Sequence, residues 1–152
     1  MSKTIRALIV ALVVVCLLVG FWVVIWILPD VPTKSIRSYF SAIMDQDYQK
    51  AWSYIYPNSE FMRDRGGPTM SFEKFRDDLT NARSHGTKMT EFKILKVYEQ
   101  QDPLAKITAQ IVRIQTENIV SGNPKTSDPK DYYLRKDKDG VWKIYKGQIP
   151  KE

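Results

Sequence analysis

Residues 36–55 read IRSYFSAIMDQDYQKAWSYI, and apolar side chains recur in this stretch at helical spacing. The polar run Asp45-Gln46-Asp47 divides the pattern into two blocks. Side chains at positions i, i+3, i+4 and i+7 lie on one face of a helix. The stretch therefore predicts two short amphipathic helices with a bend at Asp47. Their apolar faces consist of Ile36, Tyr39, Phe40, Ile43 and Met44, and of Tyr48, Ala51, Trp52 and Ile55.

The ends of these two helices carry polar side chains that can satisfy free backbone groups. Thr33 or Ser35 is the predicted N-cap of the first helix, because a hydroxyl oxygen accepts hydrogen bonds from free backbone amides. Asp45 and Asp47 are predicted to end the first helix and to cap the second. We therefore assign these two carboxylates structural rather than catalytic roles.

A third helix is predicted to follow Ser71, which stands where an N-cap is expected. Gly86 is its predicted stop, because glycine adopts the left-handed conformation that commonly ends helices. His85 precedes that stop, where a cationic imidazole would interact favourably with the helix end. The apolar face of this helix consists of Phe72, Phe75, Leu79 and Ala82.

After Gly86 the pattern changes to segments rich in β-branched and aromatic residues, which are typical of strands. Asp139-Gly140 is a strong signal for a hairpin turn between the last two segments. Residues 118–131 contain several polar and turn-forming residues and are predicted to be a loop. The four predicted strands are 90–99, 104–117, 132–136 and 141–149.

The second predicted strand changes its alternation part-way along. Its apolar residues occupy odd positions up to Ile111 and even positions from Val112. Such a phase change is what a β-bulge produces, and a bulge bends the sheet. The sequence therefore predicts an α+β domain, with about three helices packed on one face of a curved four-stranded antiparallel sheet.

Upstream of this domain, Ala7 to Leu28 form a run without a charged residue. As a helix the run would span about 33 Å, enough to cross the hydrocarbon core of a bilayer. A cleaved signal peptide is the alternative, but its apolar region is usually shorter and ends at a small-x-small site. We expect the run to remain as a single transmembrane helix.

Lys3 and Arg6 precede the run, which predicts a cytoplasmic N-terminus and an extracytoplasmic domain in the cell membrane. Trp22 and Trp26 would lie at the outer membrane interface, where indole rings prefer to lie. The predicted organisation is a cytoplasmic tail (1–6), a transmembrane helix (7–28), a linker (29–34) and an extracytoplasmic domain (35–152).

The amino-acid composition argues against most kinds of metal, cofactor and catalytic site. The 152 residues carry a formal net charge of +6 and include one histidine and one cysteine, Cys16, which lies inside the apolar run. A lone histidine without cysteines cannot form a typical zinc site. Gly66-Gly67 lacks the lysine and the preceding strand of a phosphate-binding loop. We therefore expect no metal, no cofactor and no catalytic residue.

The chain resembles the nuclear transport factor 2-like superfamily, whose members include ketosteroid isomerase and scytalone dehydratase. The residues that carry the resemblance are Tyr39-Phe40 with Asp47-Tyr48 and Ala51-Trp52, the helix start at 71–75, and the closing hairpin at 139–144. The resemblance implies a cone-shaped domain of the membrane-anchored bacterial type. It also implies a pocket, for which the candidate lining residues are Tyr39, Tyr48, Trp52, Tyr98 and Trp142.

An anchor followed by a fold that can form pockets or dimers predicts a non-catalytic binding or assembly module, an accessory subunit of a membrane or cell-envelope complex. Its expected partners are the lipid bilayer and another membrane-protein subunit or a second copy. Basic residues mingled with aromatic ones near the C-terminus could also contact anionic lipid or cell-wall polymer, but not nucleic acid. The alternative is a small-ligand-binding or weakly catalytic protein that uses the cone pocket at the membrane surface.

The transmembrane prediction has a direct test. The full-length chain should stay in the membrane pellet after washing with alkaline carbonate, because an apolar helix of this length is stable in lipid. Mass spectrometry should find a mature protein that still contains residues 7–28. Release by carbonate, or a mature N-terminus beyond residue 28, would contradict the prediction.

Overall fold

The computed structural model describes residues 31–56, 70–102 and 107–147. The predicted transmembrane helix at 7–28, with Trp22 and Trp26, lies outside the described residues. No helix within the three described ranges is both long enough and apolar enough to cross a membrane.

The two helices predicted from residues 36–55 are present as α2 (Pro32–Met44) and α3 (Tyr48–Ser53). Asp45 ends α2, Gln46 adopts a positive φ of 63°, and Asp47 caps α3 by accepting a hydrogen bond from the Lys50 amide at 3.1 Å. The predicted cap of α2 at Thr33 or Ser35 is wrong. The helix begins at Pro32, two to four residues earlier than these caps imply, and the fixed φ of proline suits the first helical position.

The third predicted helix is α4 (Phe72–Ser84). The Ser71 hydroxyl accepts a hydrogen bond from the Lys74 amide at 3.2 Å, as expected for an N-cap. Phe75 and Leu79 are buried on its inner face. The helix ends at His85, and Gly86 follows with a φ of +86°, a conformation that a residue with a Cβ adopts only with strain.

Within the described residues, the antiparallel sheet has five strands rather than the four predicted. They are β1 (Thr87–Asp102), β2 (Ile107–Val120), β3 (Asn123–Thr126), β4 (Lys130–Lys136) and β5 (Trp142–Lys146). The order is β1-β2-β4-β5, and β3 pairs with the end of β2. β3 lies inside the predicted polar loop, and all four of its side chains are exposed. It is held by backbone pairing, so it carries no apolar pattern.

The predicted hairpin turn at Asp139-Gly140 connects β4 and β5. Gly140 has a φ of +79°, and the Asp137 carboxylate accepts hydrogen bonds from the amides of Asp139 at 2.9 Å and Val141 at 3.0 Å. Lys143 lies 3.0 Å from the same carboxylate. The Asp137 side chain therefore organises the turn that the glycine permits.

The predicted bulge in the second strand is wrong in its location. β2 pairs continuously with β4, and its change of alternation arises because it is buried on both faces. Val112 belongs to the helix-side core, whereas Ile111 is fully buried on the opposite face. The irregularities lie in β1, where Thr90 and Leu95 each stand between two paired residues, and in β5 opposite Tyr133 and Leu134 of β4.

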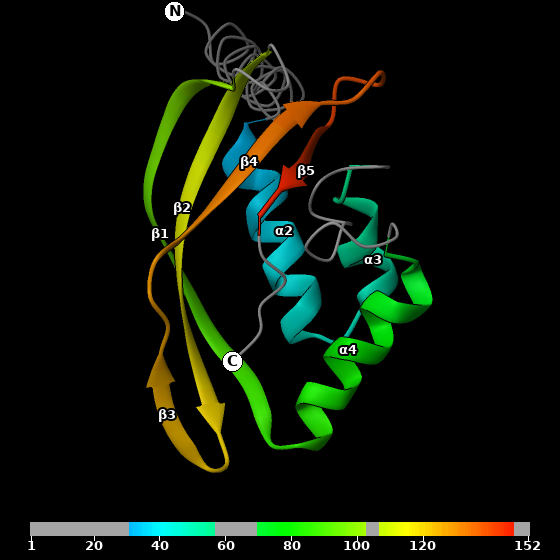
Figure 1. Cartoon of the computed structure of the whole chain (residues 1–152), viewed down its shortest axis with the longest axis vertical. Coiled ribbons are helices and arrows are strands. Elements are labelled where there is room, and N and C mark those ends of the chain that lie inside the picture. Colours follow the sequence, from blue (N-terminus) through cyan, green and yellow to red (C-terminus); the bar gives the residue numbers. More distant parts are fainter. Residues whose placement is uncertain (1–30, 57–69, 103–106, 148–152) are drawn as a thin grey trace, which may run out of the picture.

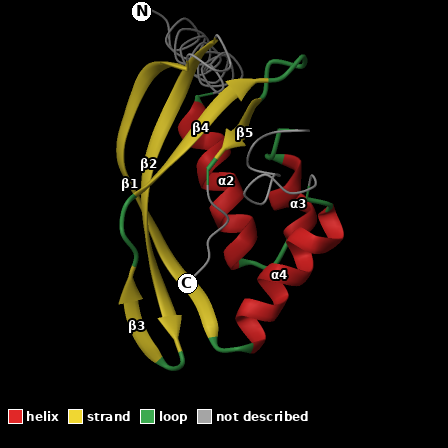
Figure 2. Cartoon of the chain, viewed as in Figure 1, coloured by secondary structure: helices red, strands yellow, loops and turns green. Residues whose placement is uncertain are grey.

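Helices α2, α3 and α4 lie on one side of the curved sheet (Figures 1 and 2). α2 packs against β1, β2 and β5, α4 packs against β1, and α3 bridges α2 and α4. The core between the layers is centred on Phe40 of α2. Its ring contacts Tyr39 and Tyr132 edge-to-face, with centroid distances of 5.1 and 5.3 Å, and stacks on Phe92 at 5.1 Å.

Replacing Phe40 should test whether this aromatic cluster is the centre of the fold. Phe40→Ala should lower the free energy of unfolding by about 3–5 kcal/mol, because it removes a fully buried ring and leaves a cavity. Urea unfolding of the full chain in a non-ionic detergent measures the change. Leu95→Ala, at an exposed position, is the control and should change stability by less than about 0.5 kcal/mol. Equal effects of the two substitutions would contradict the assignment.

Candidate functional site

Large side chains fill the space between α2 and the sheet, where a cone-shaped pocket was expected. Tyr39, Phe40 and Tyr132 are 0–2% exposed, and their rings contact one another. Burial raises the pKa of the Tyr39 phenol well above its usual value and also raises the pKa of Tyr132. Both phenols therefore stay protonated near neutral pH, so neither is a base there.

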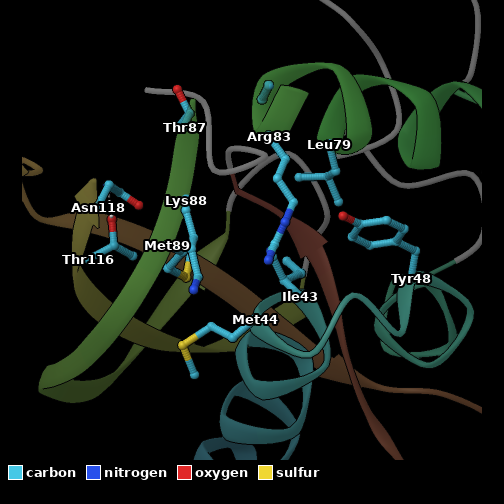
Figure 3. A pocket seen from close by; sticks show the side chains of 11 residues that line it. Ile43, Met44, Tyr48, Leu79, Arg83, Thr87, Lys88, Met89, Thr116 and Asn118 are labelled. Atoms are coloured by element: carbon cyan, nitrogen blue, oxygen red, sulfur yellow. Dashed lines mark hydrogen bonds between the residues drawn. The ribbon is translucent and has the colours of Figure 1, made fainter. Parts of the chain in front are cut away.

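A small cleft remains at one end of this interior, between the C-terminal ends of α2 and α4 and the adjoining parts of β1 and β2 (Figure 3). Its cavity volume is about 50 Å³. One water occupies about 30 Å³ in the liquid, so the cleft has room for one small chemical group. Drug-sized ligands need pockets of about 300 Å³ or more. The cleft is lined by Ile43, Met44, Tyr48, Leu79, Ala82, Arg83, Thr87, Lys88, Met89, Thr116 and Asn118.

The walls of the cleft combine an apolar side with a polar one. Ile43, Leu79 and Met89 belong to the hydrophobic core and line the apolar side. On the polar side, the Asn118 amide donates to the Thr116 hydroxyl at 3.2 Å, which in turn bonds Ser127 Oγ at 3.0 Å. None of the described residues that line the cleft carries a carboxylate. An acid–base reaction that needs a carboxylate base therefore has no such group at this place.

The structure separates the five residues predicted to line a pocket. Tyr48 lines the cleft, and Tyr39 is buried in the core. Trp52 packs between Phe72 and Phe75, with ring centroid distances of 5.9 and 5.3 Å. Trp142 packs against the edge of the core, with Lys136 Nζ 5.5 Å above its ring. Tyr98 lies on the other face of the sheet.

That other face, here called the outer face, carries the residues that alternate with the core-facing ones of β1, β2, β4 and β5. Arg113 donates from Nε and Nη2 to the two oxygens of Asp131, each at 2.7 Å, and Tyr98 donates to Asp131 Oδ2 at 3.1 Å. The hydrogen bonds from Arg113 hold the pKa of the Asp131 carboxyl below its usual value. Burial and the bond to Asp131 raise the pKa of Tyr98.

A second acid–tyrosine pair joins two distant strands on the outer face. The Tyr145 hydroxyl of β5 donates to Asp102 Oδ2 at the end of β1, at 2.9 Å, and both side chains are buried. Burial, followed by the hydrogen bond to Asp102, raises the pKa of Tyr145. A buried carboxylate beside a tyrosine is thus present, but it lies away from the cleft.

Sequence reasoning did not identify Arg83, Asp102 or Asp131 as candidate site residues. Each acquires its position through contacts between distant segments, such as the 43 residues that separate Asp102 from Tyr145. The pairing of Arg113 with Asp131 requires the register of β2 against β4, which no local pattern reveals. The one available signal for Arg83 was its place in the last turn of a predicted helix.

His85 lies at the end of α4 and is exposed, as predicted for a structural residue. Its Nδ1 atom is 2.8 Å from the Asn81 carbonyl oxygen in the preceding turn. Within the described ranges, no three side chains of histidine, cysteine, aspartate or glutamate gather closely enough to hold a metal ion.

Two solved structures share the arrangement of helices and sheet. One is a ketosteroid isomerase-like protein from Erwinia carotovora atroseptica SCRI1043, with a TM-score of 0.56 and 15% sequence identity over 78% of this chain and 91% of that chain. The other is ActVI-ORFA from Streptomyces coelicolor, with a TM-score of 0.52 and 9% identity over 76% and 93% of the two chains. The fold is nuclear transport factor 2-like. At these identities the likeness establishes the fold alone. No protein-family model and no curated protein sequence matches the chain.

The Asp131 cluster makes a prediction about pH. The pKa of Asp131 is lower in the folded than in the unfolded chain, where it is near 3.8. The contribution of ionised Asp131 to the free energy of unfolding is therefore present above that pH. It is lost as the pH falls through the pKa that Asp131 has in the folded chain. Asp131→Asn should lower the free energy of unfolding near pH 7, and the difference from wild type should shrink towards about pH 3.

Urea unfolding at both pH values measures this difference. Asp78→Asn is the control, because Asp78 pairs with Lys74 on the exposed surface of α4 and such pairs contribute little. A difference between wild type and Asp131→Asn that does not change between the two pH values would contradict the prediction.

Proposed function

We propose that this chain is a non-catalytic assembly module tethered to the membrane, an accessory subunit of a membrane or cell-envelope complex. The observation that carries the proposal is the filled interior of the cone. Tyr39, Phe40 and Tyr132 fill the space between α2 and the sheet, where a pocket was expected. The ionisable groups with shifted pKa values on the outer face, Asp131 and Tyr145 among them, lie away from the cleft.

A surface for a partner is available along β1, at one edge of the sheet. At the opposite edge, β5 is covered by residues 54–56: the Tyr56 amide donates to the Ile144 carbonyl and the Ile144 amide donates to the Tyr54 carbonyl, each at 2.8 Å. The outer edge of β1 pairs with no strand within the described ranges. An uncovered edge strand offers a row of backbone donors and acceptors to another chain.

Exposed apolar side chains lie in the middle of this free edge strand. Leu95 is 48% exposed and Val97 is 42% exposed, whereas Lys93 and Lys96 beside them limit non-specific pairing. A partner strand laid along β1 would cover both apolar side chains and satisfy the free backbone groups. This arrangement supports a partner that is another membrane-protein subunit or a second copy of the chain.

The test is purification from the native membrane in a mild non-ionic detergent, followed by identification of co-purifying proteins and measurement of the complex mass. The wild-type chain should be recovered with a partner subunit or as a dimer. The double variant L95K/V97K should lose about tenfold or more of that partner, because two charges would be placed in the contact.

The matched control is Ile119→Lys, which also replaces an exposed apolar residue, at the far end of β2. It should retain the partner at the wild-type level. A wild-type chain recovered as a monomer, with an ordered small molecule bound, would overturn the assembly proposal. Equal loss of the partner in both variants would exclude β1 as the contact.

A further inference from the structure

The charged side chains that line the cleft described above all carry a positive charge. Of the eleven residues that line it, the two charged ones, Arg83 and Lys88, are both basic. In Figure 3 the Arg83 side chain extends from α4 into the cleft, between Leu79 and Ile43, and the Lys88 side chain runs along it from β1. Two positive charges without a lining carboxylate favour an anion at this place.

Neither Arg83 nor Lys88 forms an ion pair with another residue in the described part of the chain. The ion pairs there employ Lys74, Arg76, Lys93, Arg113 and Lys143 as the basic partners. The Arg113 guanidinium, for example, donates hydrogen bonds from Nε and Nη2 to the two carboxylate oxygens of Asp131. Arg83 and Lys88 have no such partner within the described ranges, although Arg83 is half-buried.

The surroundings of Arg83 strengthen its attraction for an anion. Its planar guanidinium can donate two parallel hydrogen bonds to a carboxylate or phosphate, and Lys88 can add a third donor from a flexible stem. The apolar side chains of Met44, Leu79 and Met89 line the same space and exclude water from part of it. Charge-assisted hydrogen bonds are stronger where water is partly excluded.

The size of the cleft limits what can enter. A cavity of about 50 Å³ holds one carboxylate or phosphate group but not the body of a larger molecule. The rest of such a ligand must lie outside the cavity. We propose that Arg83 and Lys88 form a binding site for a single oxyanion group, the carboxylate or phosphate end of a larger molecule. This site goes beyond the assembly role and does not depend on it.

The competing explanation is that Arg83 serves only the helix. A basic side chain in the last turn of α4 interacts favourably with the free carbonyl groups at the helix end. That role needs no ligand and no contribution from Lys88. Binding measurements distinguish the two explanations. If Arg83 serves only the helix end, replacing Lys88 leaves the affinity for an oxyanion unchanged.

The experiment titrates the full chain, in a non-ionic detergent at constant ionic strength, with inorganic phosphate, acetate and hexanoate. Backbone amide chemical shifts of Thr87–Met89 and Thr116–Asn118 report binding. At least one probe should give saturable shifts at these amides. Tightest binding by phosphate identifies a phosphate end group, whereas hexanoate binding more tightly than acetate identifies a carboxylate on an aliphatic chain.

Three variants complete the test. Arg83→Gln should weaken binding about tenfold or more, because it removes a charge-assisted contact, and the exposed Lys88→Gln should weaken it in the same direction. Arg37→Gln, on the exposed side of the first half of α2, is the matched control and should bind as wild type does. The absence of saturable shifts with all three probes would overturn the proposal. Unchanged affinity in both cleft variants would overturn it as well.

Discussion

The packing of Phe40 against Tyr39, Phe92 and Tyr132 is the contact on which the rest of the structure depends. It joins α2 to two strands of the sheet and fixes the distance between the two layers. Because these large rings occupy the interior, the cleft at one end of it is small. The same packing that stabilises the domain therefore fills the space between α2 and the sheet. Within the described residues, the features outside this core are the cleft, the outer face and the edge of β1 that pairs with no strand.

Local signals in the sequence predicted the helices well. Asp47 and Ser71 cap helices in the structure because capping depends on a side chain and an amide three positions away. Gly140 lies in the predicted hairpin turn for a similarly local reason. The start of α2 was placed wrongly because Val31, its N-cap, makes no side-chain cap hydrogen bond, so no capping residue marks the helix start at Pro32.

Features that depend on distant partners could not be predicted. β3 has no apolar alternation and exists through backbone pairing with β2, which the sequence Asn123-Pro124-Lys125-Thr126 does not reveal. The change of alternation at Ile111 and Val112 was a real signal with two possible causes, a bulge or burial on both faces. Only the register against β4 distinguishes them, and it favours burial. The cleft shares this limitation, because its lining residues come from five elements, α2, α3, α4, β1 and β2.

The direction of α2 relates the proposed anchor to the proposed site. The helix begins at Pro32, inside the predicted linker (29–34), and its last residues, Ile43 and Met44, line the cleft. Thirteen helical residues span about 20 Å, so the helix places the cleft that far from the end where the chain would leave the bilayer. Figure 1 shows the N-terminal end of α2 and the ends of β1 and α4 that border the cleft at opposite ends of the domain. In a tethered domain standing away from the membrane, Arg83 and Lys88 would meet solutes or partner chains rather than the headgroups of the lipids that hold the anchor. The oxyanion group that fits the cleft would then come from the compartment that the domain faces.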